Sequence, residues 1–224
     1  MPPPGLGREP PRGRYAAGLE HLFRLSPRPG SRIIRVDPEL SNAAAPRTMI
    51  LVDPNLDPDP TPHSSAPGAT SGAARLPSAR TLARFLSRAK AAVRLRGEVS
   101  VLLTTDRKIR ELNSRFRGKN KATDVLSFPA ASGPEKAAGD LAIGVPVARR
   151  QAAEQGHTLG VEIRVLILHG LLHLAGYDHE TDDGQMARRE RRLRARLGLP
   201  QGLIERAEPQ QARRRNKTAR RRRP

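Results

Sequence analysis

The chain contains no cysteine and no tryptophan, and aromatic residues make up only 3% of its 224 residues. Without cysteine there are no disulfides and no thiolate metal sites, so histidine and carboxylate are the metal ligands that remain. The scarcity of aromatic rings excludes a base-stacking sheet of the kind found in RRM domains. No apolar run is long enough to cross a bilayer, and the N-terminal region has no secretory-signal pattern. We therefore expect a soluble, cytoplasmic protein.

Acidic residues are few beside basic ones. The chain has 41 Lys and Arg against 22 Asp and Glu, which gives a formal net charge of +19. Such an excess predicts affinity for polyanions, chiefly nucleic acid. Residues 211–224 hold eight of the basic residues and no acid, and a run of this kind is most often a solvated tail. Because aromatic rings are rare, we expect any RNA contacts to be made mainly to phosphate.

Three regions of the chain differ in composition. Residues 1–48 are rich in Pro, Gly and Arg and show no sustained periodicity, which predicts a disordered or mis-assigned N-terminal extension. Within it, residues 33–36 are a candidate local strand. One folded domain is expected over residues 49–205, and its part over residues 49–76 should hold a first strand and a flexible link. Residues 206–224 should form a disordered Arg-rich tail.

Hydrophobic periodicity predicts short helices and strands that interleave along the domain. Met49–Val52 should form a buried edge strand, and Met49 is also a candidate for the true start of the protein. Asp106 should cap the second helix. This pattern indicates an α+β fold, a small mixed four-stranded sheet packed with helices around a central metal-binding helix. The expected strands are residues 49–52, 98–104, 125–129 and 139–144, and the expected helices are residues 77–95, 106–116, 146–156, 161–174 and 183–197.

The expected central helix carries the most distinctive pattern of the chain. Residues 161–174 are apolar on nearly every side, as expected of a buried helix. His169 and His173 are four residues apart, so their imidazoles project from one face about 6 Å apart, within reach of one metal ion. Gly176 provides a left-handed position that ends the helix, so that His179 can return as a third ligand. The result is a zincin-like H-x3-H-x5-H site.

Three imidazoles would leave one corner of a tetrahedral zinc ion open for water, as in catalytic sites. The ion would lower the pKa of that water toward roughly 7. A single histidine is more often satisfied by a backbone partner, but three of the six histidines at ligand spacing favour metal binding. His21, His63 and His157 lack such spacing, so we expect them on the surface.

The same frame, H-x-x-x-H-x-x-G-x-x-H, is used by metzincin proteases, which carry a general-base glutamate directly after the first histidine. Gly170 stands at that position here. A zinc metalloprotease is therefore a less favoured alternative.

Three ordered segments carry a more specific resemblance. They are residues 112–129 (LNSRFRGKNKATDVLSFP), 139–141 (GDL) and 169–179 (HGLLHLAGYDH). Together they closely resemble the YbeY family of metal-dependent endoribonucleases, also called rRNA maturation factors, over roughly residues 49–200. One departure is residues 120–122 (NKA), where many members have an acid and a proline.

This resemblance implies a single-strand-directed, zinc-dependent endoribonuclease that acts in small-subunit rRNA 3′-end maturation and ribosome quality control. It implies one Zn²⁺ per chain on His169, His173 and His179, and a functional arginine at Arg117 in the cleft beside the metal. The implied partners are single-stranded rRNA, ribosomal particles and a ribosome-associated GTPase or PhoH-like ATPase, with no membrane. A non-catalytic ribosome-assembly factor with structural zinc is the main alternative.

The expected chemistry is phosphodiester cleavage, in which negative charge builds on phosphoryl oxygens between the metal and a guanidinium. Arg117 is the preferred phosphate clamp because its fork binds two oxygens at once. Lys119 and Lys121 are weaker candidates for RNA contacts. Either metal-activated water attacks phosphorus or the metal activates the ribose 2′-hydroxyl, and both routes stay open. Asp178 and Glu180 can orient a ligand, accept a proton or simply face solvent.

Two further polar residues, Ser127 and Asp140, stand near the ends of expected strands. They are candidates for lining the cleft, and structural roles as a strand hydroxyl and a turn carboxylate are equally expected.

Overall fold

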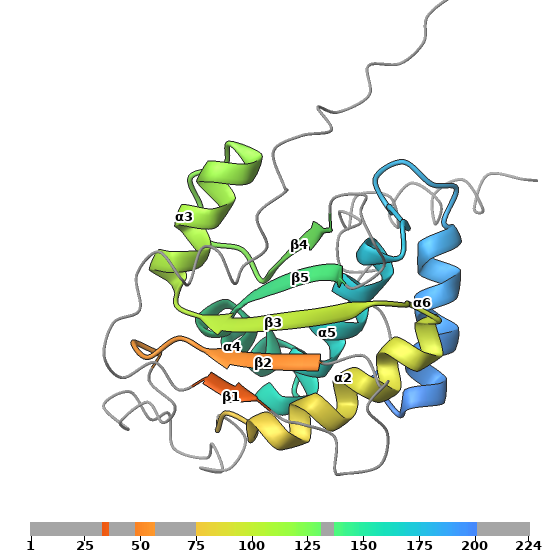
Figure 1. The fold of residues 1–224 in the computed structure, drawn as a ribbon, viewed down its shortest axis with the longest axis horizontal. Coiled ribbons are helices and arrows are strands. Elements are labelled where there is room, and N and C mark those ends of the chain that lie inside the picture. The colour runs from red at the N-terminus through yellow and green to blue at the C-terminus, as the bar shows by residue number, and fades with distance from the viewer. Residues whose placement is uncertain (1–32, 36–47, 57–74, 131–136, 201–224) are drawn as a thin grey trace, which may run out of the picture.

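A mixed five-stranded sheet forms the centre of the molecule (Figure 1). The computed structural model describes residues 33–35, 48–56, 75–130 and 137–200. The strand order is β1-β2-β3-β5-β4, in which β2, β3 and β5 are parallel and the outer strands β1 and β4 pair antiparallel. The strands are β1 (Ile33–Arg35), β2 (Thr48–Val52), β3 (Glu98–Thr104), β4 (Val125–Pro129) and β5 (Ala137–Gly144).

Four of these strands, β2 to β5, form the mixed sheet expected from the sequence, and β1 adds a fifth at the candidate local strand. The expectation that Met49–Val52 lies at the sheet edge is wrong, because β1 pairs with the outer side of β2 and places Ile34 opposite Ile50. β2 also begins at Thr48, one residue before the expected start of the domain. The domain boundaries stay predictions, because most residues that flank them lie outside the described residues.

Side chains of the strands alternate between the two faces of the sheet, as the pleat requires. Each face therefore contributes to a separate cluster of buried side chains. The larger cluster contains Ile50, Val101, Leu103, Leu141 and Ile143 from the sheet, and the smaller cluster contains Leu51, Leu102, Leu126 and Ala142.

Helices cover both faces of the sheet and give the molecule three layers (Figure 1). Ile109 and Leu112 of α3 complete the smaller cluster, while the other four helices contribute to the larger one. None of the described helices combines the length and the apolar character that a membrane span requires. The helices, all expected from the sequence, are α2 (Ala79–Val93), α3 (Asp106–Arg117), α4 (Val145–Glu154), α5 (Leu159–Leu174) and α6 (Gln185–Leu197).

The two ends of α3 differ from the expectation in ways that matter for the site. Thr105 caps the helix by accepting a hydrogen bond from the N–H of Lys108. Asp106 does not cap it, because a cap needs an extended backbone, which Thr105 has, whereas Asp106 is already in the first helical turn. Gly118 ends the helix in a left-handed conformation with φ +69°. Arg117 therefore belongs to the last turn of α3, one residue beyond the end of the helix expected over residues 106–116.

The central helix is α5, and twelve of its sixteen residues are buried. Thr158 caps its N-terminus by accepting a hydrogen bond from the N–H of Val161. The helix packs on β4, β5 and the helices α2, α4 and α6. Because β4 passes beside the C-terminal half of α5, His169 and His173 lie at the edge of the core and face the cleft described next.

Candidate metal centre

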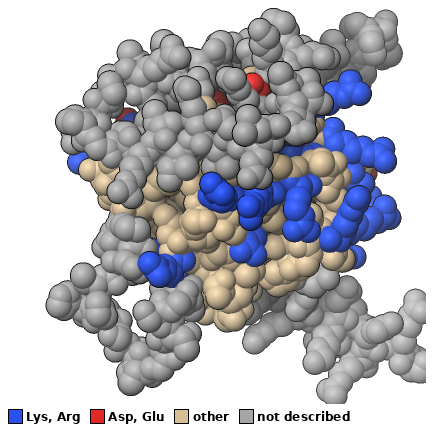
Figure 2. Space-filling view, turned by 60° about the horizontal axis from the view of Figure 1, so that its bottom comes forward, with Lys and Arg blue, Asp and Glu red and all other residues tan. Residues whose placement is uncertain are grey.

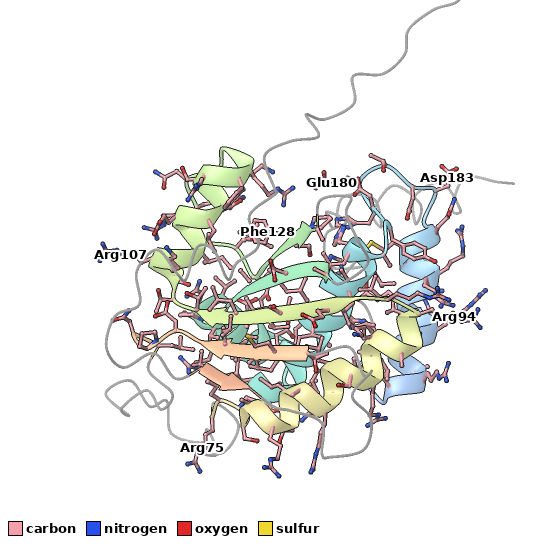
Figure 3. The ribbon with its side chains drawn as sticks, viewed as in Figure 1. Arg75, Arg94, Arg107, Phe128, Glu180 and Asp183 are labelled. Carbon is pink, nitrogen blue, oxygen red and sulfur yellow. The ribbon has the colours of Figure 1, made fainter. Side chains whose placement is uncertain are left out.

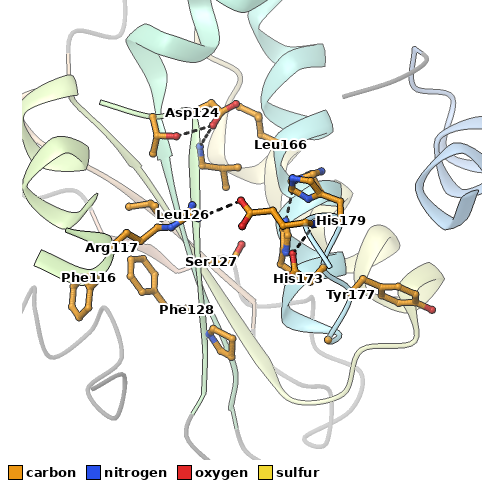
Figure 4. A pocket seen from close by; sticks show the side chains of 17 residues that line it. Phe116, Arg117, Asp124, Leu126, Ser127, Phe128, Leu166, His173, Tyr177 and His179 are labelled. Carbon is orange, nitrogen blue, oxygen red and sulfur yellow. Dashed lines mark hydrogen bonds and ion pairs between the residues drawn. The ribbon is translucent and has the colours of Figure 1, made fainter. Parts of the chain in front are cut away.

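A cleft of about 540 Å³ opens where the C-terminal end of α5 meets β4 and the end of α3 (Figure 4). The loop that follows α5 forms its remaining wall. All three histidines of the motif line this cleft, and so does Arg117. The full lining consists of Phe116, Arg117, residues 123–129, Leu166, His169, His173 and residues 176–180.

His169 and His173 lie one turn apart on α5 and present their ring nitrogens to each other. Their Nε2 atoms are 3.1 Å apart, and their ring centroids are 4.8 Å apart. Two nitrogens bound about 2.0–2.1 Å from a tetrahedral zinc ion lie about 3.4 Å apart. The two imidazoles are therefore spaced like two ligands of a single ion.

His179 completes the group from the loop after α5. Gly176 turns the chain with φ +87°, as expected, and the His179 ring centroid lies 5.4 Å from that of His169 and 5.2 Å from that of His173. The three potential ligand atoms all lie within 4.8 Å of one another. His179 Nδ1 is buried without a hydrogen-bond partner among the described residues, so none of these groups competes with an ion for it. These three histidines can hold a metal ion.

Asp178 fixes the loop that carries His179. Its carboxylate accepts hydrogen bonds from the N–H of Glu180 at 3.0 Å and from the hydroxyl of Thr181 at 3.2 Å. The hydrogen bond from the Glu180 N–H is the main reason that the pKa of Asp178 lies below its usual value, while partial burial opposes this shift. Asp178 thus remains an anion that closes a tight turn next to the third histidine.

The imidazole of His173 is held in its neutral form. Its pKa is lowered from 6.5 to about 4, mainly by burial and also by the nearby rings of His169 and His179, while Asp178 opposes this shift in part. A metal ligand must offer a lone pair, which a protonated imidazole lacks. At neutral pH His173 is therefore ready to bind an ion without first losing a proton.

Glu190 of α6 orients the first histidine from behind. Its Oε2 accepts a hydrogen bond from His169 Nδ1 at 3.1 Å, and its Oε1 accepts from Arg194 Nε at 2.8 Å and also from Arg194 Nη2. Burial raises the pKa of Glu190, but the hydrogen bond from His169 and the electrostatic influence of His169 and Arg194 lower it more, so its pKa lies below the usual value. The ionised carboxylate fixes the proton on Nδ1, which leaves Nε2 free for a metal.

No motif in the sequence pointed to Glu190. It lies 21 residues beyond His169, and its only local signal is Arg194 four residues later on the same helix. Arg194 is fully buried and also donates from Nη1 to the Pro200 carbonyl at 2.7 Å. The charge of Glu190 is therefore balanced from within the fold.

Arg117 faces the histidines from the other wall of the cleft (Figure 4). Its Nη2 lies 3.6 Å from Oε1 of Glu180, the residue after the third histidine, and its side chain is 47% exposed. The described contacts of Glu180 thus join it to Arg117 rather than to an imidazole. A half-exposed guanidinium at this place can reach an anionic group that enters the cleft.

The other candidate residues are distributed between the cleft and its surroundings. Ser127 lines the cleft and donates from Oγ to the Gly170 carbonyl at 3.5 Å. Asp140 lies on β5 outside the lining. Lys119 and Lys121 are exposed and also lie outside the lining, so their expected RNA contacts stay predictions.

Aromatic side chains gather at the cleft although they are rare in the chain. Phe116, Phe128 and Tyr177 all line it, and these are half of the six aromatic residues present. Phe116 and Phe128 pack edge to face with centroids 5.1 Å apart. No spacing along the chain could have united the three rings, because they lie on α3, on β4 and after α5.

His157 is not the surface residue that was expected. Its side chain is only 14% exposed, and its Nε2 pairs with the fully buried carboxylate of Glu162 near the start of α5. This pair lies at the end of α5 opposite to the cleft. His21 and His63 lie outside the described residues.

The absence of a glutamate after His169 has a steric basis. A Cβ atom placed on Gly170 would lie 2.7 Å from Cδ2 of Leu141 and 3.3 Å from Oγ of Ser127. A side chain at this position would have to displace Leu141, which is fully buried. Glycine therefore suits the close approach of α5 to the sheet, and the general base of a metzincin protease is absent from this site.

Comparison with known proteins identifies one family model and several similar proteins. The family model described as Endoribonuclease YbeY matches residues 75–198. Proteins named Endoribonuclease YbeY from Koribacter versatilis and Solibacter usitatus are 54% and 53% identical over 129 and 125 residues, which cover 58% and 56% of this chain and 84% and 83% of theirs. The protein of the same name from Nautilia profundicola is 50% identical over 111 residues, or 50% of this chain and 80% of its own. A solution structure of a Thermotoga maritima protein aligns at 29% identity with a TM-score of 0.41, over 55% of this chain and 85% of that one.

Proposed function

The chain belongs to the endoribonuclease YbeY family, and we propose that it is a zinc-dependent endoribonuclease that cuts single-stranded RNA. The observation that carries this proposal is the arrangement of the cleft, in which Arg117 faces three imidazoles that can hold one ion. Cleavage of a phosphodiester builds negative charge on its phosphoryl oxygens. A cation on one side and a guanidinium on the other match that charge better than they match the uncleaved substrate.

Zinc fits the donor set, because three imidazoles without thiolates are a common ligand set of catalytic zinc. When bound by His169, His173 and His179, one zinc ion per chain would supply a Lewis acid and lower the pKa of a water molecule toward roughly 7. His173 is already neutral and Glu190 holds the proton of His169 on Nδ1. The protein thus prepares the ligands before the ion arrives.

Arg117 is the residue that we propose to hold the scissile phosphate. Among the described residues its guanidinium pairs only with the exposed carboxylate of Glu180, at 3.6 Å. A phosphate offers two oxygens to the planar guanidinium, so it can displace a single distant carboxylate oxygen. Arg117 would then orient the phosphate toward the histidines and stabilise the charge that develops on it.

The aromatic rings of the cleft support a preference for single strands. Unpaired bases can leave the helical stack and lie on aromatic faces, which paired bases cannot do. Phe128 and Tyr177 are partly exposed and line the cleft together with the histidines. A single strand whose bases contact these rings would bring its phosphates between Arg117 and the ion.

We further propose ribosomal RNA as the biological substrate, with roles in small-subunit rRNA 3′-end maturation and in ribosome quality control. The chain has 41 basic and 22 acidic residues, and the resulting positive charge supports binding to ribosomal particles. Proposed protein partners are a ribosome-associated GTPase and a PhoH-like ATPase. Isolation of tagged protein from cells, followed by sequencing of bound RNA and mass spectrometry, tests both points.

The decisive experiment measures metal content and RNA cleavage together. Purified wild-type protein, Arg117→Ala and His173→Ala are tested on a single-stranded fragment from the small-subunit rRNA 3′ region and on the same fragment annealed to its complement. We expect one zinc per wild-type chain, cleavage of the single strand only, and loss of cleavage in both variants. Undiminished cleavage by both variants would refute the proposal, and a wild type that binds zinc without cleaving would favour an assembly factor.

A further inference from the structure

The exposed faces of α2 and α6 carry two rows of arginines. Within each row the residues are four apart, so they project from one side of the helix at steps of about 6 Å, and each row spans about 12 Å. All six side chains are exposed. We call this surface the arginine face; it consists of Arg80, Arg84 and Arg88 on α2 and of Arg188, Arg192 and Arg196 on α6.

The two helices meet near the C-terminal end of α2. α2 and α6 pack against each other, and Arg189 Nη2 donates to the Ala92 carbonyl at 3.4 Å. Arg94, directly after α2, lies beside α6 in Figure 3. In Figure 2 basic side chains spread over the part of this side of the molecule that grey atoms do not cover.

Opposite charges are missing within the two helices. α2 contains no acidic residue, and the only one in α6 is Glu190. Glu190 is 2% exposed and paired with His169 and Arg194, so it does not neutralise the surface. Among the described residues Arg188 donates to the carbonyl of Asp183, and no carboxylate within α2 or α6 neutralises the rows. Neighbouring guanidinium groups repel one another, and a polyanion bound across them would relieve that repulsion.

The arginine face lacks the features that read bases. The only aromatic residue of α2 and α6 is Phe85, which is 7% exposed. Surfaces that bind single strands combine basic groups with exposed rings for stacking. Guanidinium groups without rings suit a phosphate backbone whose bases are already paired inside a double helix.

The arginine face is also separate from the cleft. None of the residues that line the cleft belongs to α2 or α6. Figure 3 places Phe128 and Glu180 of the cleft in its upper part, while Arg75 and Arg94, which flank α2, lie along the lower and right edges. The cleft contains the aromatic rings and the arginine face contains none that is exposed, so the two surfaces suit different forms of RNA.

From these observations we infer that the arginine face binds the phosphate backbone of a double-helical RNA segment while the cleft cuts a neighbouring single strand. This inference rests on the proposed function for its choice of RNA as the polyanion. The contact is independent of sequence and sensitive to salt, because it replaces counterions on the phosphates. It would direct the enzyme to single strands next to a stem.

Two double variants test the arginine face, Arg84→Gln with Arg88→Gln and Arg192→Gln with Arg196→Gln. The matched control is Arg107→Gln with Arg110→Gln, which removes the same charge from exposed positions on α3, across the sheet. Each full-length protein is titrated with a blunt RNA duplex at several KCl concentrations. We expect each face variant to make the slope of log K against log salt shallower by about 2, and the control to keep the wild-type slope.

Cleavage of a short single-stranded oligoribonucleotide provides the second readout, and it should stay within about twofold of wild type in all three variants. An unfolding temperature equal to that of the wild type shows that a variant folds. Equal losses of duplex affinity in the face variants and the control would overturn the inference. The same proteins are also titrated with phosphatidylglycerol vesicles and with polyglutamate. A loss of binding in the face variants that is confined to the vesicles or to polyglutamate would also overturn the inference, because it would assign the face to a membrane or to an acidic protein.

The outcomes also separate this inference from the proposed function. If wild type binds the duplex through the arginine face but cleaves no RNA, the proposed function fails and the binding surface stands. If wild type cleaves single strands while the face variants bind duplex as wild type does, the arginine face alone is refuted.

Discussion

The guanidinium of Arg117 and the carboxylate of Glu180 face each other at the cleft, with Nη2 of the arginine 3.6 Å from Oε1 of the glutamate. Their side chains are 47% and 64% exposed, and ion pairs this exposed contribute about 0–1 kcal/mol. The pair therefore keeps the arginine directed at the cleft without binding it firmly. A phosphate that enters the cleft can take over the guanidinium with little loss of free energy.

Replacement of Arg117 tests its role as a phosphate clamp. Arg117→Ala should lower kcat for single-stranded RNA by about 10²- to 10³-fold, the usual loss when one charge-stabilising donor is removed. Arg117→Lys should recover only a small part, because a lysine cannot donate two parallel hydrogen bonds. Zinc content and unfolding temperature should match wild type in both variants. A lysine variant with full activity would show that charge alone suffices.

Glu180→Gln separates a competing carboxylate from a catalytic one. Without the negative charge Arg117 is free for substrate, so KM should fall by roughly twofold to fivefold at low salt, in line with an exposed pair of about 0–1 kcal/mol. kcat should change little. Steady-state kinetics on a single-stranded oligonucleotide measures both constants. A drop in kcat of about a hundredfold would instead assign Glu180 a role in proton transfer.

Glu190→Gln should weaken metal binding although Glu190 touches no metal itself. The amide cannot hold the His169 proton as a carboxylate does, and loss of such a partner typically lowers metal affinity by about 10- to 100-fold. It also leaves the buried Arg194 without its anion, which destabilises the fold by about 3–5 kcal/mol. Zinc competition with a chelator and urea unfolding measure the two effects. Glu154→Gln, an exposed site on α4, is the control and should change neither.

Gly170→Ala tests the close approach of α5 to the sheet. The added Cβ would lie 2.7 Å from Cδ2 and 3.0 Å from Cδ1 of Leu141, a fully buried residue. Overpacking of this kind destabilises proteins by about 1–3 kcal/mol. Combination with Leu141→Val should recover part of the loss, which a double-mutant cycle would show as a favourable coupling. Purely additive effects would mean that Leu141 does not limit the space.

Acid should destabilise the metal-free protein through His173. Its pKa is about 4 in the folded protein, below the ordinary value of 6.5 that applies to the unfolded chain, so between these values the unfolded chain binds more protons than the folded one. The contribution of His173 to the free energy of unfolding is therefore complete above pH 6.5 and is lost as the pH falls toward 4. Chelator-treated wild type should thus lose more stability over this range than His173→Asn. Parallel curves for the two proteins would contradict the assignment.

Much of the architecture follows from local sequence patterns. β3 and β4 begin and end where the alternation of apolar residues placed them, and α5 is the buried helix that its apolar composition indicated. The three histidines come together for a local reason as well. A helical turn and one left-handed glycine fix their positions within eleven residues, so the spacing of His169, His173 and His179 was sufficient to group them.

Other features depended on contacts between distant elements. β1 pairs with β2 and makes it an interior strand. His157 is largely buried because it pairs with Glu162. Arg117 of α3 lies beside Glu180 of the loop after α5. Thr105 and Asp106 are both good capping residues, and the path of the chain from β3 into α3 selected Thr105.

By itself the sequence thus determined which segments form helices and strands and which histidines can share an ion, because these depend on spacing along one or two adjacent elements. Only the tertiary structure decided that Glu190 supports His169, that the aromatic rings line the cleft, and that the arginines of α2 and α6 form one surface. Such contacts depend on how helices pack across a sheet, and packing is set by the fit of many buried side chains together. No short stretch of sequence contains that information.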